Sequence, residues 1–425
     1  MRIEVSKYEN YIAILREELV PAVGCTEPAC LALAGAKLRQ VLGEVPQTIT
    51  VKLSGNLIEN TKSVTIPHSR GLKGIAAAIW LGITGGDPDL GLAVLSSVTD
   101  GDIRNTEMLM EDAARCSVEL LDSGAKLHLV LAGTGSQSHA LVEIVDTHTN
   151  FVRIEKDGQV LLGQVTGADE RRLKADRSLL NVDDILSFAD SVHIEDVEPI
   201  LRPQIEYNTA IAEQGLAGDY GSNVGRTLIE HFGDAVGNVA RALAAAASDA
   251  RMDGCQLPVV INSGSGNQGI AASIPVIVYA QHHHLPEEKL LRALCVSNLV
   301  AIHQKTGMDS LSAYCGAVSA ACGSGAGIAY LLGGDYEQVS STITNALANV
   351  AGILCDGAKA SCAAKIASAV DAAIVALTMA LDASRFADGD GIVKADVEET
   401  IDVVRKIASE GMRETDVTVI RHMMK

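Results

Sequence analysis

Hydrophobic and polar residues follow two different patterns along the chain. Between residues 45 and 199, stretches such as TITVKLSGN, SVTIP and KLHLVLAG alternate with a period of two, which is typical of β-strands. HALVEIVDTHTNFVRIEKDGQVL predicts a hairpin, while GLKGIAAAIWLGI and NTEMLMEDAARCSVELLDSG have helical spacing. Residues 45–199 are therefore expected to form an α/β domain.

Residues 200–425 carry a helical pattern almost throughout. Alanine- and glycine-rich segments, among them NVARALAAAASDARM and AAKIASAVDAAIVALTMAL, are each followed by glycine, proline or polar residues that end helices. Residues 1–44 predict N-terminal helices, broken around PAVGCTEPAC, that dock on this helical domain. The expected fold class is α+β, with a predominantly helical, Ala/Gly-rich domain and a smaller α/β domain.

Composition and charge narrow the classes of partner. Of 425 residues, 48% are apolar and 20% are charged, which is enough apolar material for a sizeable core. The net charge of −19 repels phosphate backbones and argues against nucleic acid as a partner. We find no apolar run long enough to cross a membrane and no signal peptide, so we expect a cytoplasmic protein without a membrane partner.

Nine cysteines in a chain without a secretion signal are expected to stay free of disulfides. Cys355 and Cys362 are seven residues apart, as are Cys315 and Cys322. Seven residues of unbroken helix span about 10.5 Å, but Asp356-Gly357 favours a turn that places Cys355 on a loop and Cys362 on the next helix, where both can converge. Cys322 begins CGSGAGIAY, which we interpret as another glycine-rich approach to a helix.

Three thiolates without a nearby fourth suit a [4Fe–4S] cluster that leaves one iron open for substrate. Cys322, Cys355 and Cys362 are the candidates for this role. Three buried structural cysteines are the alternative, because free cysteine is among the most buried residue types.

Cys25 lies in VGCTEPAC, between a glycine and a break in the helical pattern. A thiolate at a helix N-terminus has a lowered pKa and can act as base, nucleophile or metal ligand. A structural role for Cys25 is an equal alternative, and Cys30 is assigned to the core.

INSGSGNQGI matches the glycine spacing of a dinucleotide-binding loop, but Pro275 follows too closely for the helix that should carry the pyrophosphate. We interpret this loop instead as a site for a small carboxylate or amino group, bound by backbone N–H groups and short polar side chains. LSGNLIEN, which carries Ser54 and Asn56 after a predicted strand, is interpreted in the same way. The candidate substrate-binding residues are Ser54, Asn56, Ser265, Asn267 and Gln268.

Two further stretches imitate metal sites. The HHH run at 282–284 is expected in an exposed loop before a helix. FADGDGIVKADVEE resembles a calcium-binding loop, but Phe386 and Val397 occupy its first and last ligand positions and cannot coordinate calcium. We interpret it as a turn before a capped helix.

Five stretches occur together and span nearly the whole chain: GCTEPA at 24–29, SGNLIEN at 54–60 with IP at 66–67, SGSGNQG at 263–269, LSAYCGAVSAACGSGAGIAYLLGG at 311–334 and CDGAKASC at 355–362. In this combination the chain resembles the L-cysteine desulfidase family, which is related to the iron–sulfur L-serine dehydratases. The resemblance implies a lyase that forms pyruvate by β-elimination without pyridoxal phosphate. It also implies that Cys322, Cys355 and Cys362 are the cluster ligands, and that Cys25 is a base or a displaceable fourth ligand.

The chain departs from that family's pattern at IPHSRG, where the family continues IPG. If this loop lines the site, Arg70 could meet an extra substrate carboxylate and His68 could act as acid or base. A solvent-exposed loop with neutral changes is the alternative. Glu59 and Lys62 also differ from the expected residues, and Lys305 is a second candidate for the catalytic base.

The expected function is an iron–sulfur-dependent lyase that converts L-cysteine to pyruvate, ammonia and sulfide. The alternatives are a dehydratase of L-serine or another β-substituted amino acid, a non-catalytic relative that binds a small molecule, and a structural zinc protein with Cys315 as fourth ligand. A small amino acid is the expected substrate, and the sequence is compatible with a homodimer. The leaving group, the base and the oligomeric state stay open.

Overall fold

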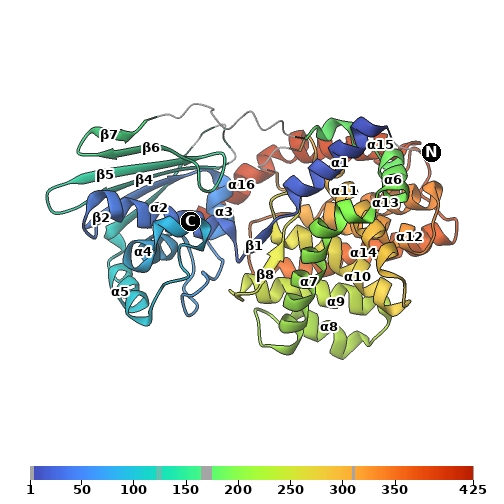
Figure 1. Cartoon of the computed structure of the whole chain (residues 1–425), viewed down its shortest axis with the longest axis horizontal. Coiled ribbons are helices and arrows are strands. Elements are labelled where there is room, and N and C mark those ends of the chain that lie inside the picture. The colour runs from blue at the N-terminus through green and yellow to red at the C-terminus, as the bar shows by residue number, and fades with distance from the viewer. Residues whose placement is uncertain are drawn as a thin grey trace.

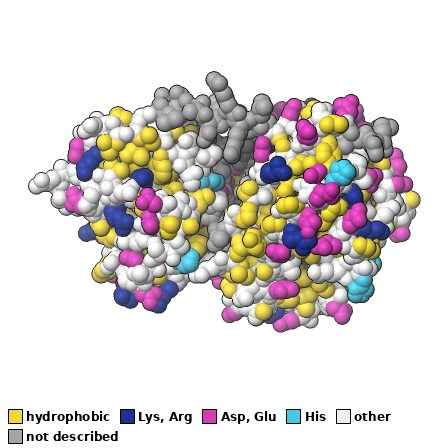
Figure 2. All heavy atoms as spheres, viewed as in Figure 1, with side chains coloured by type: hydrophobic (Ala, Val, Ile, Leu, Met, Phe, Trp, Pro, Cys, Tyr) yellow, Lys and Arg dark blue, Asp and Glu magenta, His cyan; other side chains and the backbone are white. Residues whose placement is uncertain are grey.

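The computed structural model describes residues 4–121, 123, 125, 127–163, 175–308 and 312–424. Buried hydrophobic side chains form two large cores, one against a β-sheet and one among helices, and the two parts lie side by side in Figure 1. The predicted fold class, mainly helical with a smaller α/β part, is confirmed. Acidic side chains are spread over the visible face of the helical part (Figure 2), in keeping with the net charge.

Six strands of the described residues form one mixed sheet in the order β3-β2-β4-β5-β6-β7, in which β2 and β3 are parallel and the other neighbours antiparallel. Alternate residues of β4 and β5 are buried, as the period-two pattern predicted, and β5 and β6 are the predicted hairpin. The strands are β2 (Thr48–Leu53), β3 (Cys116–Leu120), β4 (His128–Thr134), β5 (His139–Val145), β6 (Phe151–Lys156) and β7 (Gln159–Leu162).

Helices complete the smaller part. Helix α2 packs on β4 and β5, α4 packs on α2, and α5 packs on α4, while α3 follows the end of β2. These helices are α2 (Thr26–Leu42), α3 (Gly55–Thr61), α4 (Ile75–Gly85) and α5 (Asp100–Met110). Short 3₁₀ segments span Pro88–Ala93 and Ala113–Arg115.

The larger part surrounds α12 (Gly316–Leu331), which contacts α10, α11, α13 and α14. Small residues allow these close approaches: a methyl group on Gly323 would lie 2.5 Å from the backbone oxygen of Ser297 on α11. The other helices are α1 (Val5–Glu18), α6 (Val182–Ser191), α7 (Ile194–Ala217), α8 (Val224–Phe232), α9 (Val236–Met252), α10 (Gly266–His282), α11 (Glu287–Lys305), α13 (Tyr336–Val350), α14 (Cys362–Leu381), α15 (Val397–Lys406) and α16 (Arg413–Met424). A 3₁₀ segment spans Arg177–Leu179, and a π-helical turn at Ile407–Gly411 precedes α16.

The N-terminal residues divide between the two cores rather than docking together on the helical part. Tyr11 and Leu15 of α1 are buried in the helical core, whereas α2 packs in the core of the sheet. The break between these helices contains β1 (Pro21–Val23), which pairs antiparallel with β8 (Pro258–Val260). This pairing joins the segment between α1 and α2 to the helical part.

The domain boundary expected near residue 200 falls inside α7. Leu180, Ile185 and Phe188 already belong to the helical core, because α6 presents a strongly amphipathic face to it. The change from sheet to helical core therefore lies between Leu162 and Leu180. The charged stretch at 164–174 lies outside the described residues.

Pro275 does not prevent a helix after the glycine-rich loop, contrary to expectation. Helix α10 begins at Gly266 and continues through Pro275 to His282. The conclusion against a dinucleotide-binding fold nevertheless holds on topology. The strand before the loop, β8, pairs antiparallel with β1, whereas the dinucleotide motif requires a parallel βαβ unit.

The two imitations of metal sites have the structures expected of them. His282, His283 and His284 are exposed at the end of α10. The stretch from Phe386 leads through turns to α15, whose N-cap Asp396 accepts a hydrogen bond from the backbone N–H of Glu398 at 2.6 Å.

One described helix, α14, is long and apolar enough to cross a membrane by length and composition alone. Half of its most apolar window is buried inside the protein. It packs on α9, α12 and α13, as core helices of this composition commonly do.

Candidate functional site

The motifs that are distant in sequence meet where the two parts of the protein touch. A methyl group on Gly357 would lie 2.1 Å from the backbone oxygen of Glu59, so the CDGAKASC loop rests directly on α3. A methyl group on Gly24 would lie 2.6 Å from Cγ of Pro67, so the GCTEPA and IP segments also touch. Both glycines have positive φ angles, +82° and +63°, which favour glycine. C-terminal helix α16 packs on α3 at the same junction (Figure 1).

Cys315 and Cys355 lie diagonally across two short segments that are joined by an antiparallel β-bridge between Tyr314 and Leu354. Backbone hydrogen bonds join Cys355 N–H to Ala313 at 2.6 Å and Cys315 N–H to Ile353 at 3.1 Å. The neighbouring Cys315 thiol is the main cause that lowers the pKa of Cys355. The backbone N–H of Gly357 and two lysines lower the pKa of Cys355 further. Cys355 is therefore favoured as a thiolate, the form that binds metals.

Cys362 completes this group from the start of α14, which confirms the predicted turn after Cys355. Its sulfur lies 3.5 Å from the backbone oxygen of Gly357, inside the turn that joins the two cysteines. Its charge interacts with both Cys355 and Cys315. The two lysines that favour the Cys355 thiolate are Lys359 and Lys365, and both also bind Asp356.

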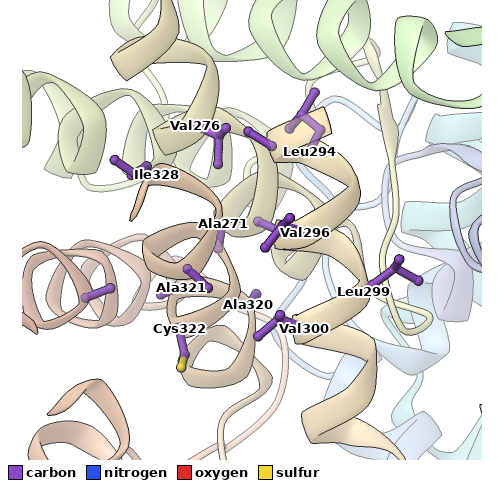
Figure 3. Close-up of a cluster of buried hydrophobic side chains, with 14 of the residues drawn as sticks. Ala271, Val276, Leu294, Val296, Leu299, Val300, Ala320, Ala321, Cys322 and Ile328 are labelled. Carbon is purple, nitrogen blue, oxygen red and sulfur yellow. The ribbon is translucent and has the colours of Figure 1, made fainter. Parts of the chain in front are cut away.

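The structure contradicts the placement of Cys322 beside these cysteines. Helix α12 begins at Gly316 with Cys315 as its N-cap, so Cys322 lies two turns inside the helix and not at its start. Its side chain is 1% exposed, and its sulfur is directed at the backbone oxygen of Ile343, 3.7 Å away. Figure 3 shows Cys322 within the buried hydrophobic core. Cys315 occupies the place predicted for Cys322.

Among the described residues, no three His, Cys, Asp or Glu side chains converge closely enough to hold a single metal ion. A [4Fe–4S] cluster imposes a different geometry, because each cysteine binds a different iron and the thiolates need not touch. Cys315, Cys355 and Cys362 fit that requirement, since they interact with one another around one glycine turn and one of them is favoured as thiolate.

Cys25 reaches this group from the smaller part of the protein. It is the N-cap of α2, as predicted, and it packs in a small cluster with Val64, Met252 and Cys362. The predicted lowering of its pKa is wrong: the thiol is 2% exposed, and burial raises the pKa of Cys25 to about 11. The positive charge of Arg251 opposes this rise but does not cancel it.

The glycine-rich loop adjoins the cysteines through Gln268. A methyl group on Gly316, the residue after Cys315, would lie 2.5 Å from Cδ of Gln268. Ser265 closes the loop as N-cap of α10, with reciprocal backbone hydrogen bonds to Asn262 at 3.0 and 3.1 Å. The side-chain oxygen of Asn267 accepts hydrogen bonds from Arg251 at 3.2 Å and from Ser248 at 3.3 Å.

Ser54 and Asn56 lie at the start of α3. The hydroxyl oxygen of Ser54 accepts a hydrogen bond from the backbone N–H of His128 at 3.1 Å, which fastens the start of α3 to the start of β4. Asn56 is half-buried and accepts a hydrogen bond from the side-chain amide of Asn60. Their role in binding substrate stays a prediction.

The His-Ser-Arg segment that departs from the family pattern lies at the surface. Arg70 forms an exposed ion pair with Asp100 at 2.5 Å, and the His68 ring lies 3.3 Å from the side-chain nitrogen of Gln256. Ser69 is buried and donates a hydrogen bond to the backbone of Ile66 at 2.6 Å. This geometry favours the exposed-loop alternative. Lys305 is the last residue of α11 and is half-buried, and its assignment as a base stays a prediction.

Sequence reasoning gave no site role to two charged residues at the junction, and noted Glu59 only as a departure from the family pattern. Glu59 on α3 is 7% exposed, and burial, together with Asp416 and Cys355, raises the pKa of Glu59 to about 8. Arg251 near the end of α9 is 6% exposed. The sequence held one signal for Arg251, namely a charged residue within the alanine-rich segment AAAASDARM. Three atoms of the junction are buried without a hydrogen-bond partner among the described residues: Glu59 Oε1, Thr61 Oγ1 and Arg251 Nε.

Comparisons with known proteins identify the relatives of this chain. A profile described as serine dehydratase alpha chain matches residues 89–421. The chain belongs to the serine dehydratase alpha chain family. It is 53% identical over 418 residues to a UPF0597 protein of Lachnoclostridium phytofermentans, covering 98% of this chain and all of the relative. It is 46% identical to a UPF0597 protein of Treponema denticola over the full length of both. The resemblance stated from the motifs is thus confirmed at the level of this family.

Proposed function

We propose that this member of the serine dehydratase alpha chain family is a β-eliminating lyase that converts L-cysteine to pyruvate, ammonia and sulfide. The observation that carries the proposal is the meeting of Cys315, Cys355 and Cys362 with Cys25 at the junction of the two parts. L-Serine is the second candidate substrate, because the family name refers to serine and because hydroxide and hydrosulfide can leave from the same geometry.

Cys315, Cys355 and Cys362 would hold a [4Fe–4S] cluster. Such a cluster would supply a Lewis-acidic iron that assists departure of the β-group, so that pyridoxal phosphate is not needed. The Gly357 N–H, Lys359 and Lys365 stabilise negative charge on Cys355, which prepares this residue to bind iron. Cys322 is assigned a structural role as a buried core residue, which was the alternative to cluster binding for Cys322, Cys355 and Cys362.

Cys25 is the first candidate for the base that removes the Cα proton. Its burial disfavours the thiolate, and a thiolate formed there is a stronger base than one in water. Arg251 lies close enough to stabilise that thiolate. The aminoacrylate released by elimination tautomerises to an imine, which water hydrolyses to pyruvate and ammonia. Lys305 is the second candidate for the base, and Cys25 as a displaceable fourth ligand is the alternative role.

The test is anaerobic reconstitution with iron and sulfide, followed by desalting and separate addition of L-cysteine and L-serine. We expect pyruvate and sulfide from L-cysteine, and loss of both products in Cys315→Ala. Pyruvate from L-serine alone would move the assignment to a dehydratase. A bound cluster without pyruvate from either amino acid would contradict the lyase, and zinc in place of iron would favour the structural alternative.

A further inference from the structure

Arg251 is a buried arginine at the centre of the junction. It is the second-last residue of α9 and is 6% exposed. Its Nη2 donates to the backbone oxygen of Gly24 at 3.2 Å, and its Nη1 donates to the side-chain oxygen of Asn267 at 3.2 Å. These two bonds connect the GCTEPA segment to the glycine-rich loop, so the guanidinium lies between two motifs from different parts of the protein.

The charge of Arg251 has no carboxylate partner among the residues that the structure describes. Other described arginines do pair with a carboxylate: Arg241 on the same helix binds Asp371 at 2.7 Å. A buried charge is costly unless it is paired and hydrogen-bonded.

The guanidinium also has N–H donors for which the described residues provide no acceptor. An arginine offers five N–H groups, and the two hydrogen bonds to Gly24 and Asn267 leave three of them. Nε is buried without a hydrogen-bond partner in the described residues. It lies against Gly266, where a methyl group would be 2.3 Å away, so the absence of a side chain at Gly266 makes room for the guanidinium.

We propose that Arg251 binds the α-carboxylate of the substrate, an inference that rests on the proposed function and specifies how the amino acid is held. Arginine and carboxylate form paired, charge-assisted hydrogen bonds, which suit the free donors of this side chain. A carboxylate held there places the α-carbon near Cys25, which packs against Met252, the neighbour of Arg251. The site therefore selects amino acids with a free carboxylate and rejects their amides.

The first test measures binding without turnover. L-Alanine has the α-carboxylate but no β-leaving group, and L-alaninamide lacks the negative charge. We expect L-alanine, and not L-alaninamide, to raise the melting temperature of the reconstituted wild-type protein and to give a calorimetric binding signal. Arg251→Gln should lose this response, Arg251→Lys should retain part of it, and the control Arg241→Gln on the same helix should retain all of it.

The second test measures kinetics with L-cysteine. Loss of a charge-assisted hydrogen bond to the carboxylate should raise KM by ~10- to 100-fold in Arg251→Gln. If Arg251→Gln fails to fold, the comparison rests on Arg251→Lys, which keeps the charge and loses the paired geometry, and a rise in KM of ~10-fold is then expected.

Three results would overturn the inference: equal binding of L-alanine and L-alaninamide, no binding of L-alanine by the wild-type protein, or an unchanged L-alanine response in a folded Arg251→Gln protein. In each case pyruvate formation from L-cysteine would leave the proposed function intact. Conversely, L-alanine binding that depends on Arg251 in a protein that forms no pyruvate would support the carboxylate site and contradict the lyase.

Discussion

Exchanging the roles of Cys315 and Cys322 is the correction with the sharpest consequence. If Cys315 is a cluster ligand and Cys322 a core residue, the variants Cys315→Ala and Cys322→Ala should have opposite effects on iron content and on stability. The first should lose iron and keep its fold, and the second should keep iron and lose some stability. Cys295→Ala on α11 is the matched control, because Cys295 is fully buried in the same helical core.

The expected magnitudes follow from the two environments. Loss of an outer hydrogen-bond partner alone costs ~10–100-fold in metal affinity, and loss of a direct ligand costs more. Cys315→Ala also removes the neighbouring thiol that is the main influence lowering the pKa of Cys355. Cys322→Ala removes one buried sulfur, whose hydrogen bond to Ile343 is long at 3.7 Å. We expect a loss of about 1 kcal/mol in the free energy of unfolding.

The assay compares iron and sulfide content per chain, visible absorption and melting temperature after identical anaerobic reconstitution. Cys322→Ala and Cys295→Ala should match the wild type in iron and colour, with a melting temperature lower by about 2–4 °C or less. Cys315→Ala should be nearly colourless. A colourless, folded Cys322→Ala beside a fully loaded Cys315→Ala would refute the assignment made from the geometry and restore the one made from the sequence.

Three further predictions concern the junction. Glu59→Gln should remove a pH dependence of stability. Burial raises the pKa of Glu59 to about 8, so the folded chain loses stability as pH rises from about 4.5 to about 8. In urea unfolding of the metal-free chain at pH 8, the variant should therefore be more stable than the wild type by a few kcal/mol, on the order expected for this shift. A parallel pH dependence in both proteins would contradict this. Gly357→Ala should destabilise the fold by about 1–3 kcal/mol or more in thermal unfolding and release iron, because the φ of Gly357 is +82° and the methyl group would meet the Glu59 backbone. The control is Gly352→Ala, whose methyl group meets nothing within 4 Å, and it should keep both its stability and its iron. Arg70→Ala should leave KM for L-cysteine within about twofold, because exposed ion pairs contribute little; a tenfold rise would show that the exposed loop reaches the substrate.

Much of the architecture could be predicted from the sequence because its elements have strong periodic patterns. The strands β4 and β5 alternate buried and partly buried residues with a period of two, and their sequences show it. The turn between Cys355 and Cys362 was predicted from Asp356-Gly357, because that dipeptide favours turns whatever surrounds it. Local chemistry decided these features, so local reasoning was sufficient.

The errors arose where tertiary packing overrides local preference. The segment GAVSAACGSGAGIAY looks too rich in glycine for a helix, yet it forms α12 because its glycines allow contact with α11. Taking those glycines for a loop moved the helix start from Gly316 to Cys322 and exchanged one cysteine for another. Pro275 within α10 is the same kind of error, because surrounding helices keep α10 continuous there. Arg251 belongs to no motif, and only its burial makes it conspicuous.

The position of the site between two cores has a consequence for how it works. Cys25, Glu59 and Pro67 come from the smaller part, whereas Cys315, Cys355, Cys362 and Arg251 come from the larger one. Neither part carries the complete set, so the proposed chemistry depends on their contact as well as on each residue. Gly357 lies at that contact: a methyl group there would be 2.1 Å from the backbone oxygen of Glu59. The absence of a side chain at Gly357 allows the two backbones to approach there, and this contact brings the thiol of Cys25 from one part to the three thiols of the other at the proposed site.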